Sequence, residues 1–283
     1  MFQDDRMLRL TQVTFLPLAL LSILFGPLLY LFPNQTDVYF AWTITPAMSA
    51  VFIGAGYISG ALVIFRLLRL GSWHPMRPFT LGGWGFIVAI LAATLLHWDR
   101  FHHGTIFFYV WFVVYAAGPF LLPIAFWYNE RHNVPPAPDA LQLARPLRLG
   151  LIAAGAVFTV LGIILFVNPA LFIPLWPWEL TPLIARVIAA WIFLPGLGAL
   201  GAAYEPRYTA YRPLIQLSTI WALLVLIGSL LHLDAFDFSR PLAWLWFVYL
   251  VTIIPAVAGV YLYHERRYRQ PGPHIIPASP TYR

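Results

Sequence analysis

The phrase His-x-Asp-x-Phe occurs twice in this chain, and its residue types could bind a metal ion. LLHWDRF covers residues 95–101 and LLHLDAF covers residues 230–236. Imidazole and carboxylate groups are ligands that zinc and copper accept. If the two copies meet in space, the sequence predicts a zinc or copper site, and a haem held by the two histidines is a further alternative. The candidate ligands are His97, Asp99, His232 and Asp234.

A purely structural interpretation competes with the metal site. Histidine suits the membrane–water interface, aspartate accepts hydrogen bonds from loop N–H groups, and phenylalanine anchors a hairpin. Residues two apart on one helix also point in nearly opposite directions. The aspartate would have to leave the helix for a joint site to form, so no cofactor is assigned and both interpretations stay open.

Arg186 is the cation that we expect inside an apolar segment, where it needs a partner. It lies four residues after Pro182, about 6 Å along the helix, and is shallow enough to reach outward. We expect an ion pair with Glu179, which lies seven residues earlier near the same helical face, or with Asp234 or Asp237. The alternative is a contact with an anionic lipid or solute.

Enzyme signatures are weak in this chain. It has no cysteine, which excludes thiolate ligands and cysteine nucleophiles. We find no GxSxG, HExxH, P-loop or dinucleotide motif in a convincing context, so no catalytic residue is predicted. The apolar segments also lack carboxylates near mid-depth, which disfavours a proton- or sodium-coupled carrier.

Composition predicts an all-α, polytopic membrane protein. Hydrophobic residues make up 60% of the 283 positions and charged residues only 10%, far from a soluble composition. A bilayer core about 30 Å thick needs roughly 20 apolar residues per helix. Thr45-Pro46 and Thr181-Pro182 suggest two helix N-caps. Eight segments qualify or nearly qualify: 13–32, 46–66, 82–98, 105–128, 148–167, 182–203, 213–233 and 241–263.

Arginine counts orient these segments. The N-terminus, the loops after the second, fourth and sixth segments and the C-terminal tail hold 2, 3, 3, 2 and 4 of the 17 cations, all arginine, which sum to 14. The alternate loops hold only Arg100 and Arg240. The positive-inside rule therefore predicts that both termini are cytoplasmic. Binding to anionic headgroups explains this basic face, and no nucleic-acid partner is expected.

The chain resembles itself. Residues 77–132 align without a gap to 212–267 with 14 identities in 56 positions, and a one-residue shift extends the match upstream. We predict a tandem duplication of a four-helix unit, with repeats at 1–134 and 135–269 and a Pro-rich cytoplasmic tail at 270–283. Because each unit has an even number of segments, the repeats should be parallel.

Small residues are expected to pack the helices closely, as they do in membranes generally. The best candidates for the interface between the repeats lie in the second and sixth segments: Gly54, Gly56, Gly60, Gly196, Gly198 and Gly201.

These observations favour a non-catalytic protein of a prokaryotic cell (inner) membrane, either a structural or accessory subunit or a lipid-contacting scaffold. Its expected partners are the bilayer and other membrane subunits or further copies of itself. A carrier or binding protein for a small lipophilic or cationic ligand in a cleft between the repeats is the alternative. A metal or haem protein that uses His97 and His232 is the second alternative.

Overall fold

The chain folds as an all-helical bundle in the computed structural model, which describes residues 5–132 and 141–269. Residues 133–140 and the predicted tail at 270–283 lie outside these residues. Within them are nine α-helices, of which eight are long and apolar enough to cross a membrane. The eight are α1 (Arg9–Leu31), α3 (Ala47–Leu70), α4 (Met76–Leu96), α5 (Ile106–Glu130), α6 (Arg145–Val167), α7 (Pro182–Leu200), α8 (Tyr208–Leu231) and α9 (Pro241–Arg269); the ninth, α2 (Thr36–Tyr39), is one turn long.

α4 and α8 begin furthest ahead of the starts that hydropathy predicts. α4 begins at Met76 rather than near residue 82, and α8 begins at Tyr208 rather than near 213. The added turns contain Arg77 and Arg212, which lower hydropathy but pair with carboxylates. A helix can continue beyond its apolar segment when the charged residue there is paired with an opposite charge. A hydropathy average does not detect such a pair.

One of the two predicted N-caps is correct. The Thr181 side chain accepts a hydrogen bond from the Ile184 N–H at 3.2 Å. The prediction for Thr45 is wrong, because Pro46 occupies the N-cap of α3 and no side chain caps that helix.

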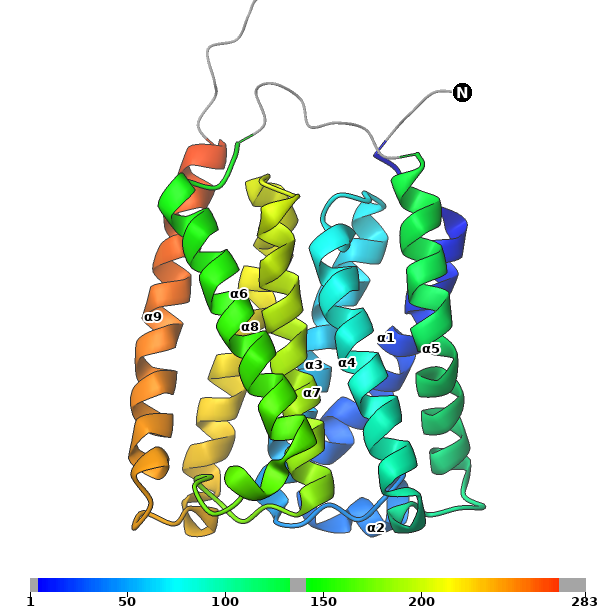
Figure 1. The fold of residues 1–283 in the computed structure, drawn as a ribbon, viewed down its shortest axis with the longest axis vertical. Helices are drawn as coiled ribbons and strands as arrows, with labels where there is room; N and C mark the ends of the chain where they lie inside the picture. Colours follow the sequence, from blue (N-terminus) through cyan, green and yellow to red (C-terminus); the bar gives the residue numbers. More distant parts are fainter. Residues whose placement is uncertain (1–4, 133–140, 270–283) are drawn as a thin grey trace, which may run out of the picture.

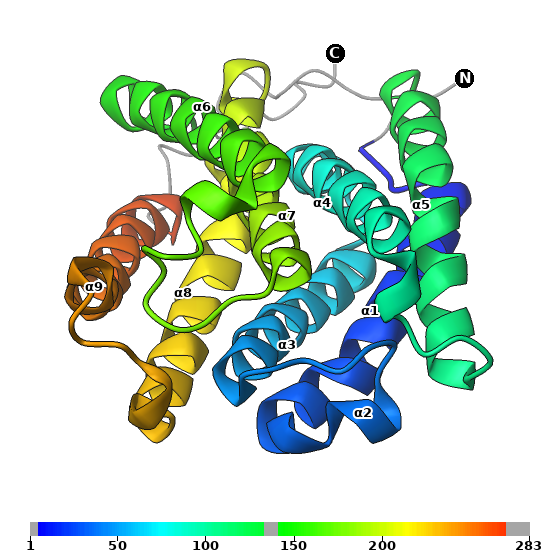
Figure 2. The same cartoon turned by 60° about the horizontal axis from the view of Figure 1, so that its bottom comes forward.

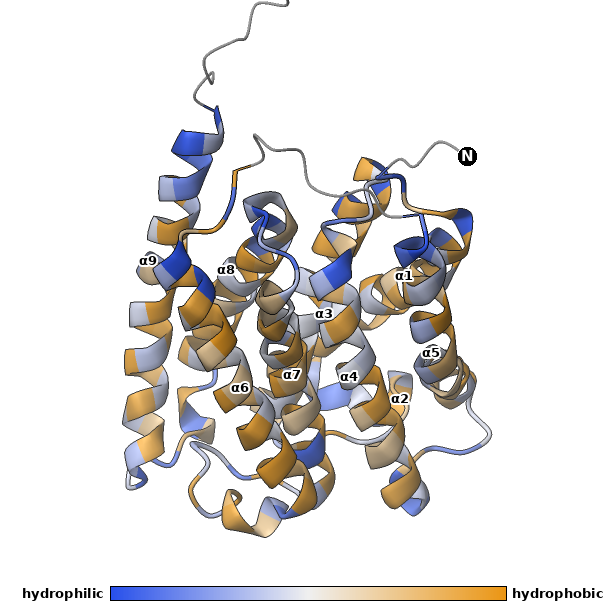
Figure 3. Ribbon diagram, turned by 45° about the horizontal axis from the view of Figure 1, so that its top comes forward, coloured by the Kyte–Doolittle hydropathy of each residue, from blue (hydrophilic) through white to orange (hydrophobic). Residues whose placement is uncertain are grey.

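The long helices run alternately up and down, and the described ends of the chain lie at the same end of the bundle (Figure 1). Viewed from the opposite end, α3, α4, α7 and α8 occupy the middle of the bundle, with α1, α5, α6 and α9 around them (Figure 2). The first half meets the second through α3 against α8 and α4 against α7. Hydrophilic residues gather at the end that holds the termini, and hydrophobic residues dominate the helix middles (Figure 3).

The two halves contain the same contacts at positions 135 or 136 residues apart. Isolated β-bridges join Trp42 to Phe101 and Trp178 to Phe236. The Trp111 indole donates to Thr94 Oγ1 at 3.4 Å, and the Trp246 indole donates to Ser229 Oγ at 3.0 Å. α1 and α6 each have 23 residues.

The halves differ at their outer helices. α5 packs against α1 as well as α4, and the Asn129 side chain joins the two through Thr11 and the Leu8 N–H. His264 occupies the matching position on α9, and its buried Nε2 has no partner among the described residues. Only four residues of α9 are buried, so this helix presents most of its surface outward.

The glycines expected at the interface have several environments. Gly54 and Gly196 pack against α1 and α6 of their own halves. Gly56 lies against Trp191 of the other half, and Gly201 against Pro78. A Cβ on Gly60 would meet nothing within 4 Å, and one on Gly198 would make ordinary contacts.

Candidate functional site

Both His-x-Asp-x-Phe phrases lie where a long helix ends, at the end of the bundle opposite the termini (Figure 1). His97 and His232 are the C-caps of α4 and α8, and one 3₁₀ turn follows each. Asp99 and Asp234 in these turns are exposed. The phenylalanines that close the phrases are buried against Trp42 and Trp178.

The structure brings no predicted metal ligands together as a set. Among residues 5–132 and 141–269, no group of three or more His, Asp or Glu side chains is placed to hold a metal. The nearest charged partner of His97 is an arginine, and that of Asp99 is the exposed Arg100 at 3.8 Å. A zinc, copper or haem site therefore stays a prediction.

Arg186 contacts a histidine where a carboxylate was expected. Its Nη1 lies 2.8 Å from His97 Nε2, and its Nε donates to the Phe166 carbonyl at 3.1 Å. A guanidinium only donates, so His97 Nε2 accepts and the imidazole is neutral. α7 packs against α4 and α6, which directs the side chain across to those helices rather than along its own loop.

The carboxylates predicted to pair with Arg186 lie elsewhere. Glu179 and Asp234 are exposed, and Asp237 accepts from Arg240 Nε at 2.8 Å. Within the described residues, no carboxylate lies within 4 Å of the Arg186 guanidinium. The cation is therefore held by neutral acceptors.

The Arg186 contact affects the titration of His97. Partial burial lowers the pKa of its imidazole, and the nearby Arg186 charge lowers it further, whereas Asp99 acts in the opposite direction. A proton on Nε2 would replace an accepted hydrogen bond with repulsion between two donors. The end of the bundle opposite the termini thus holds a neutral histidine against a fixed cation.

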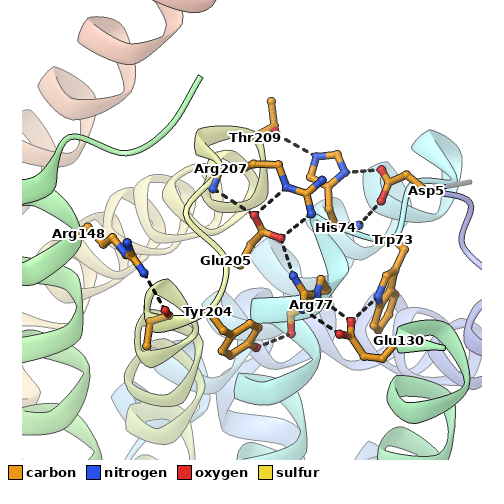
Figure 4. A network of polar contacts seen from close by, with 11 residues as sticks. Asp5, Trp73, His74, Arg77, Glu130, Arg148, Tyr204, Glu205, Arg207 and Thr209 are labelled. Atoms are coloured by element: carbon orange, nitrogen blue, oxygen red, sulfur yellow. Dashed lines mark hydrogen bonds and ion pairs between the residues drawn. The ribbon is translucent and has the colours of Figure 1, made fainter. Parts of the chain in front are cut away.

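A denser polar network lies at the end of the bundle that holds the termini (Figure 4). Arg77, in the first turn of α4, binds both carboxylate oxygens of Glu130 at the end of α5, at 2.7 and 2.8 Å. Trp73 Nε1 donates to the same carboxylate at 2.7 Å. Paired guanidinium and carboxylate groups of this geometry make strong, directional contacts.

The matching pair in the second half is Arg212 with Glu265. Arg212 Nη2 lies 2.6 Å from Glu265 Oε1, and Arg269 Nε donates to the same oxygen at 2.9 Å. Each half therefore ties the start of its third long helix to the end of its fourth.

Glu205 joins the two halves at this end. Its carboxylate is only 1% exposed and accepts from Arg77 Nη1 at 2.8 Å and from Arg207 at 2.6 and 2.7 Å. Burial alone would raise the pKa of Glu205, but the hydrogen bonds from Arg207 and Arg77 outweigh burial and lower it. Glu205 is thus an ionised buried acid between two arginines.

A second tie between the halves runs through His74. Its Nδ1 contacts the Asp5 carboxylate, and its Nε2 lies 2.9 Å from Thr209 Oγ1 (Figure 4). Hydrolase triads use the same order of hydroxyl, imidazole and carboxylate. Here the hydroxyl lies on α8, the imidazole in the α3–α4 loop and the carboxylate in the N-terminal segment, so these contacts join three segments of the chain.

Sequence reasoning missed this network, although one signal for it was present. Arg77, Glu130, Arg212 and Glu265 all belong to the identities between the halves. A charged pair retained at both positions of a repeat indicates a contact, and it could have been proposed on that basis. Nothing in the sequence indicated that Glu205 crosses to Arg77.

No protein-family model, curated protein or solved structure matches this chain.

Proposed function

We propose that the chain is a non-catalytic membrane scaffold, acting as a structural or accessory subunit or a lipid-contacting protein. The observation that carries this proposal is the interlocked packing between the halves. A Cβ on Gly56 would lie 2.5 Å from the Trp191 indole, and one on Gly82 of α4 would overlap the Leu194 carbonyl of α7. Backbones this close leave little room for a cleft between the halves.

Aromatic side chains fill the space beside these glycines. Trp191 packs against Tyr57 and Phe86 at ring-centroid distances of 5.5 and 4.6 Å. The Tyr57 and Tyr115 hydroxyls, both buried, lie 2.7 Å apart. A carrier with its cleft at this interface would have to separate Trp191 from Tyr57 and Phe86 in each cycle, because alternating access moves one half against the other. The packing therefore favours the scaffold over the carrier.

The outward surface suits lipid and protein partners. Many large apolar side chains of α5, α6 and α9 are more than half exposed, among them Phe120, Val167 and Trp244. In a membrane such residues contact acyl chains or other transmembrane helices. We propose that the bilayer, other membrane subunits or further copies of this chain cover them.

The same proposal includes a tandem duplication with parallel repeats and cytoplasmic termini in a prokaryotic cell membrane. The matched bridges, tryptophan hydrogen bonds and Arg–Glu pairs support the duplication. The placement of His97 and His232 at one end supports parallel repeats. Arginine enrichment at the other end supports a cytoplasmic location for that end.

Purification under mild, native conditions followed by mass spectrometry tests the subunit role. The proposal predicts that other membrane proteins, or further copies of the chain, remain bound in constant ratio. A chain that runs alone and transports or converts a solute in reconstituted vesicles would contradict it.

A further inference from the structure

Arg77 and Arg212 occupy matched positions, but their surroundings differ. Arg77 binds two carboxylates, those of Glu130 and Glu205. The only described carboxylate within ion-pair distance of Arg212 is that of Glu265, which also binds Arg269. One side of the interface thus contains an acid that the other side lacks.

The alignment shows what replaces that acid. The position that matches Glu205 is Leu70, or Arg69 if the one-residue shift falls after it, and the position that matches Arg207 is Ser72. His74 and Thr209 are themselves matched and touch each other. The axis that relates the two halves therefore passes close to this contact. On the side of this axis opposite Glu205, the matching position carries no carboxylate. The small side chain of Ser72 lies at the position that matches Arg207.

A pocket of about 170 Å³ occupies this position. We call it the Arg212 pocket; its polar lining consists of Arg66, Ser72, His74, Thr209, Arg212 and Gln216, together with Tyr268. No carboxylate lines it among the described residues. Its lining is suited to an anion, since guanidinium, hydroxyl and amide groups can all donate.

The charge around the Arg212 pocket is positive and only partly compensated. Arg66 Nη1 contacts the neutral Gln216 Oε1 at 2.7 Å. Neither Arg66 nor Arg69 lies within 4 Å of a carboxylate in the described part of the chain. Asp5, the nearest acid on the other side of His74, is already bound to that imidazole.

An apolar groove continues from the pocket along the outside of the bundle. This second hollow, of about 520 Å³, shares Arg66 and Leu70 with the Arg212 pocket and adds Arg69, Ile23, Leu62 and Phe65. Its apolar residues belong to α1 and α3 and include the exposed Ile23 and Leu62, and its arginines lie in the last turns of α3. A pocket lined by arginines that continues into an apolar groove fits a phospholipid: the phosphate would lie in the pocket at the membrane surface and an acyl chain in the groove.

We propose that the Arg212 pocket binds the phosphate group of an anionic phospholipid, whose acyl chain lies in the groove between α1 and α3. The phosphate takes the place that the Glu205 carboxylate holds on the other side of the interface. Arg66 and Arg212, which line the pocket, donate to it, since guanidinium groups bind phosphate in forked geometry, and Arg69 in the adjoining groove adds positive charge nearby. This site does not depend on the scaffold role, because a carrier could hold the same lipid.

Native mass spectrometry of the full chain in detergent, titrated with phosphatidylglycerol or phosphatidylcholine, tests the proposal. Wild type should bind phosphatidylglycerol more tightly than phosphatidylcholine. R66Q/R69Q loses the charge-assisted contact of Arg66 and the nearby charge of Arg69, and should weaken phosphatidylglycerol binding about tenfold or more. R9Q/R266Q, which removes two exposed arginines outside the pocket at the same end, should bind as wild type does.

A third variant keeps every arginine. L70E introduces a carboxylate at the position that matches Glu205, and it should weaken phosphatidylglycerol binding by supplying the anion internally. Thermal unfolding of each variant checks that it is folded. Unchanged lipid binding in both folded R66Q/R69Q and folded L70E would overturn the site. If inorganic phosphate alone displaces the lipid and raises the melting temperature, the ligand is a soluble phosphate and the lipid assignment is overturned.

Discussion

Substituting Gly56 with alanine should destabilise the bundle by forcing the halves apart. The added Cβ would lie 2.5 Å from Trp191 Cη2, whereas ordinary contacts begin at 3.4 Å. The indole must therefore move by about 3.4 − 2.5 = 0.9 Å. Trp191 is wedged between Tyr57 and Phe86, so it has little freedom to yield. Overpacking of this kind costs about 1–3 kcal/mol.

Gly60→Ala is the matched control. It lies one turn further along α3, and its Cβ would meet nothing within 4 Å. Both substitutions gain similar helix propensity, up to about 1 kcal/mol, so their difference isolates the clash. We expect Gly60→Ala to be as stable as wild type or more so, and Gly56→Ala to be less stable than Gly60→Ala by about 1–3 kcal/mol.

Thermal unfolding in detergent, followed by tryptophan fluorescence, measures this difference. At about 2–4 °C per kcal/mol for a chain of this size, the two midpoints should differ by roughly 2–12 °C. Equal midpoints would refute the close approach of α3 and α7, and with it the argument that the interface is filled.

Three other predictions concern the polar contacts. Because the pKa of Glu205 is lowered on folding, its stabilising effect is present above its ordinary pKa and is lost as pH falls; melting curves of E205Q should lack this acid-dependent loss and start from a lower midpoint at pH 7. The lowered pKa of His97 means that the unfolded state takes up the proton first, so the melting temperature should fall as pH drops below the ordinary imidazole pKa of 6.5; H97Q keeps an acceptor for Arg186 and should remove that dependence. W111F and W246F each lose one indole hydrogen bond to a hydroxyl and should each lower the free energy of unfolding measured with denaturant by about 1 kcal/mol; a loss in only one variant would contradict equivalent roles for the two halves.

The helices could be predicted from sequence because hydropathy and length dominate in a bilayer. The largest errors in where a helix begins fell where a charged residue is neutralised by a distant partner. Arg77 and Arg212 are inside helices for this reason, and no local pattern reveals Glu130 or Glu265 as their partners. The prediction that Thr45 caps a helix is wrong because a Thr-Pro pair can precede a helix in two registers. Thr181 is the N-cap of α7, whereas Pro46 takes that position in α3.

The candidate site was less predictable. The repeated His-x-Asp-x-Phe phrase drew attention to His97 and His232, but each histidine ends a helix of its own half. The residue of each phrase that is buried is the phenylalanine. Arg186 was recognised as unusual, yet its partner depends on which helix packs beside α7. Contacts between the halves, such as Glu205 with Arg77, depend on the arrangement of helices that the alignment of repeats does not specify.

We propose that the two halves form one rigid unit with no alternating cleft. Spin labels can be placed without background because the chain has no cysteine. Matched exposed positions report on the two ends: Leu96→Cys with Leu231→Cys at one, and Arg131→Cys with Arg266→Cys at the other. Double electron–electron resonance in lipid nanodiscs should give one narrow distance distribution at each end. Two populations that exchange in opposite directions at the two ends would show a rocking carrier and contradict the account.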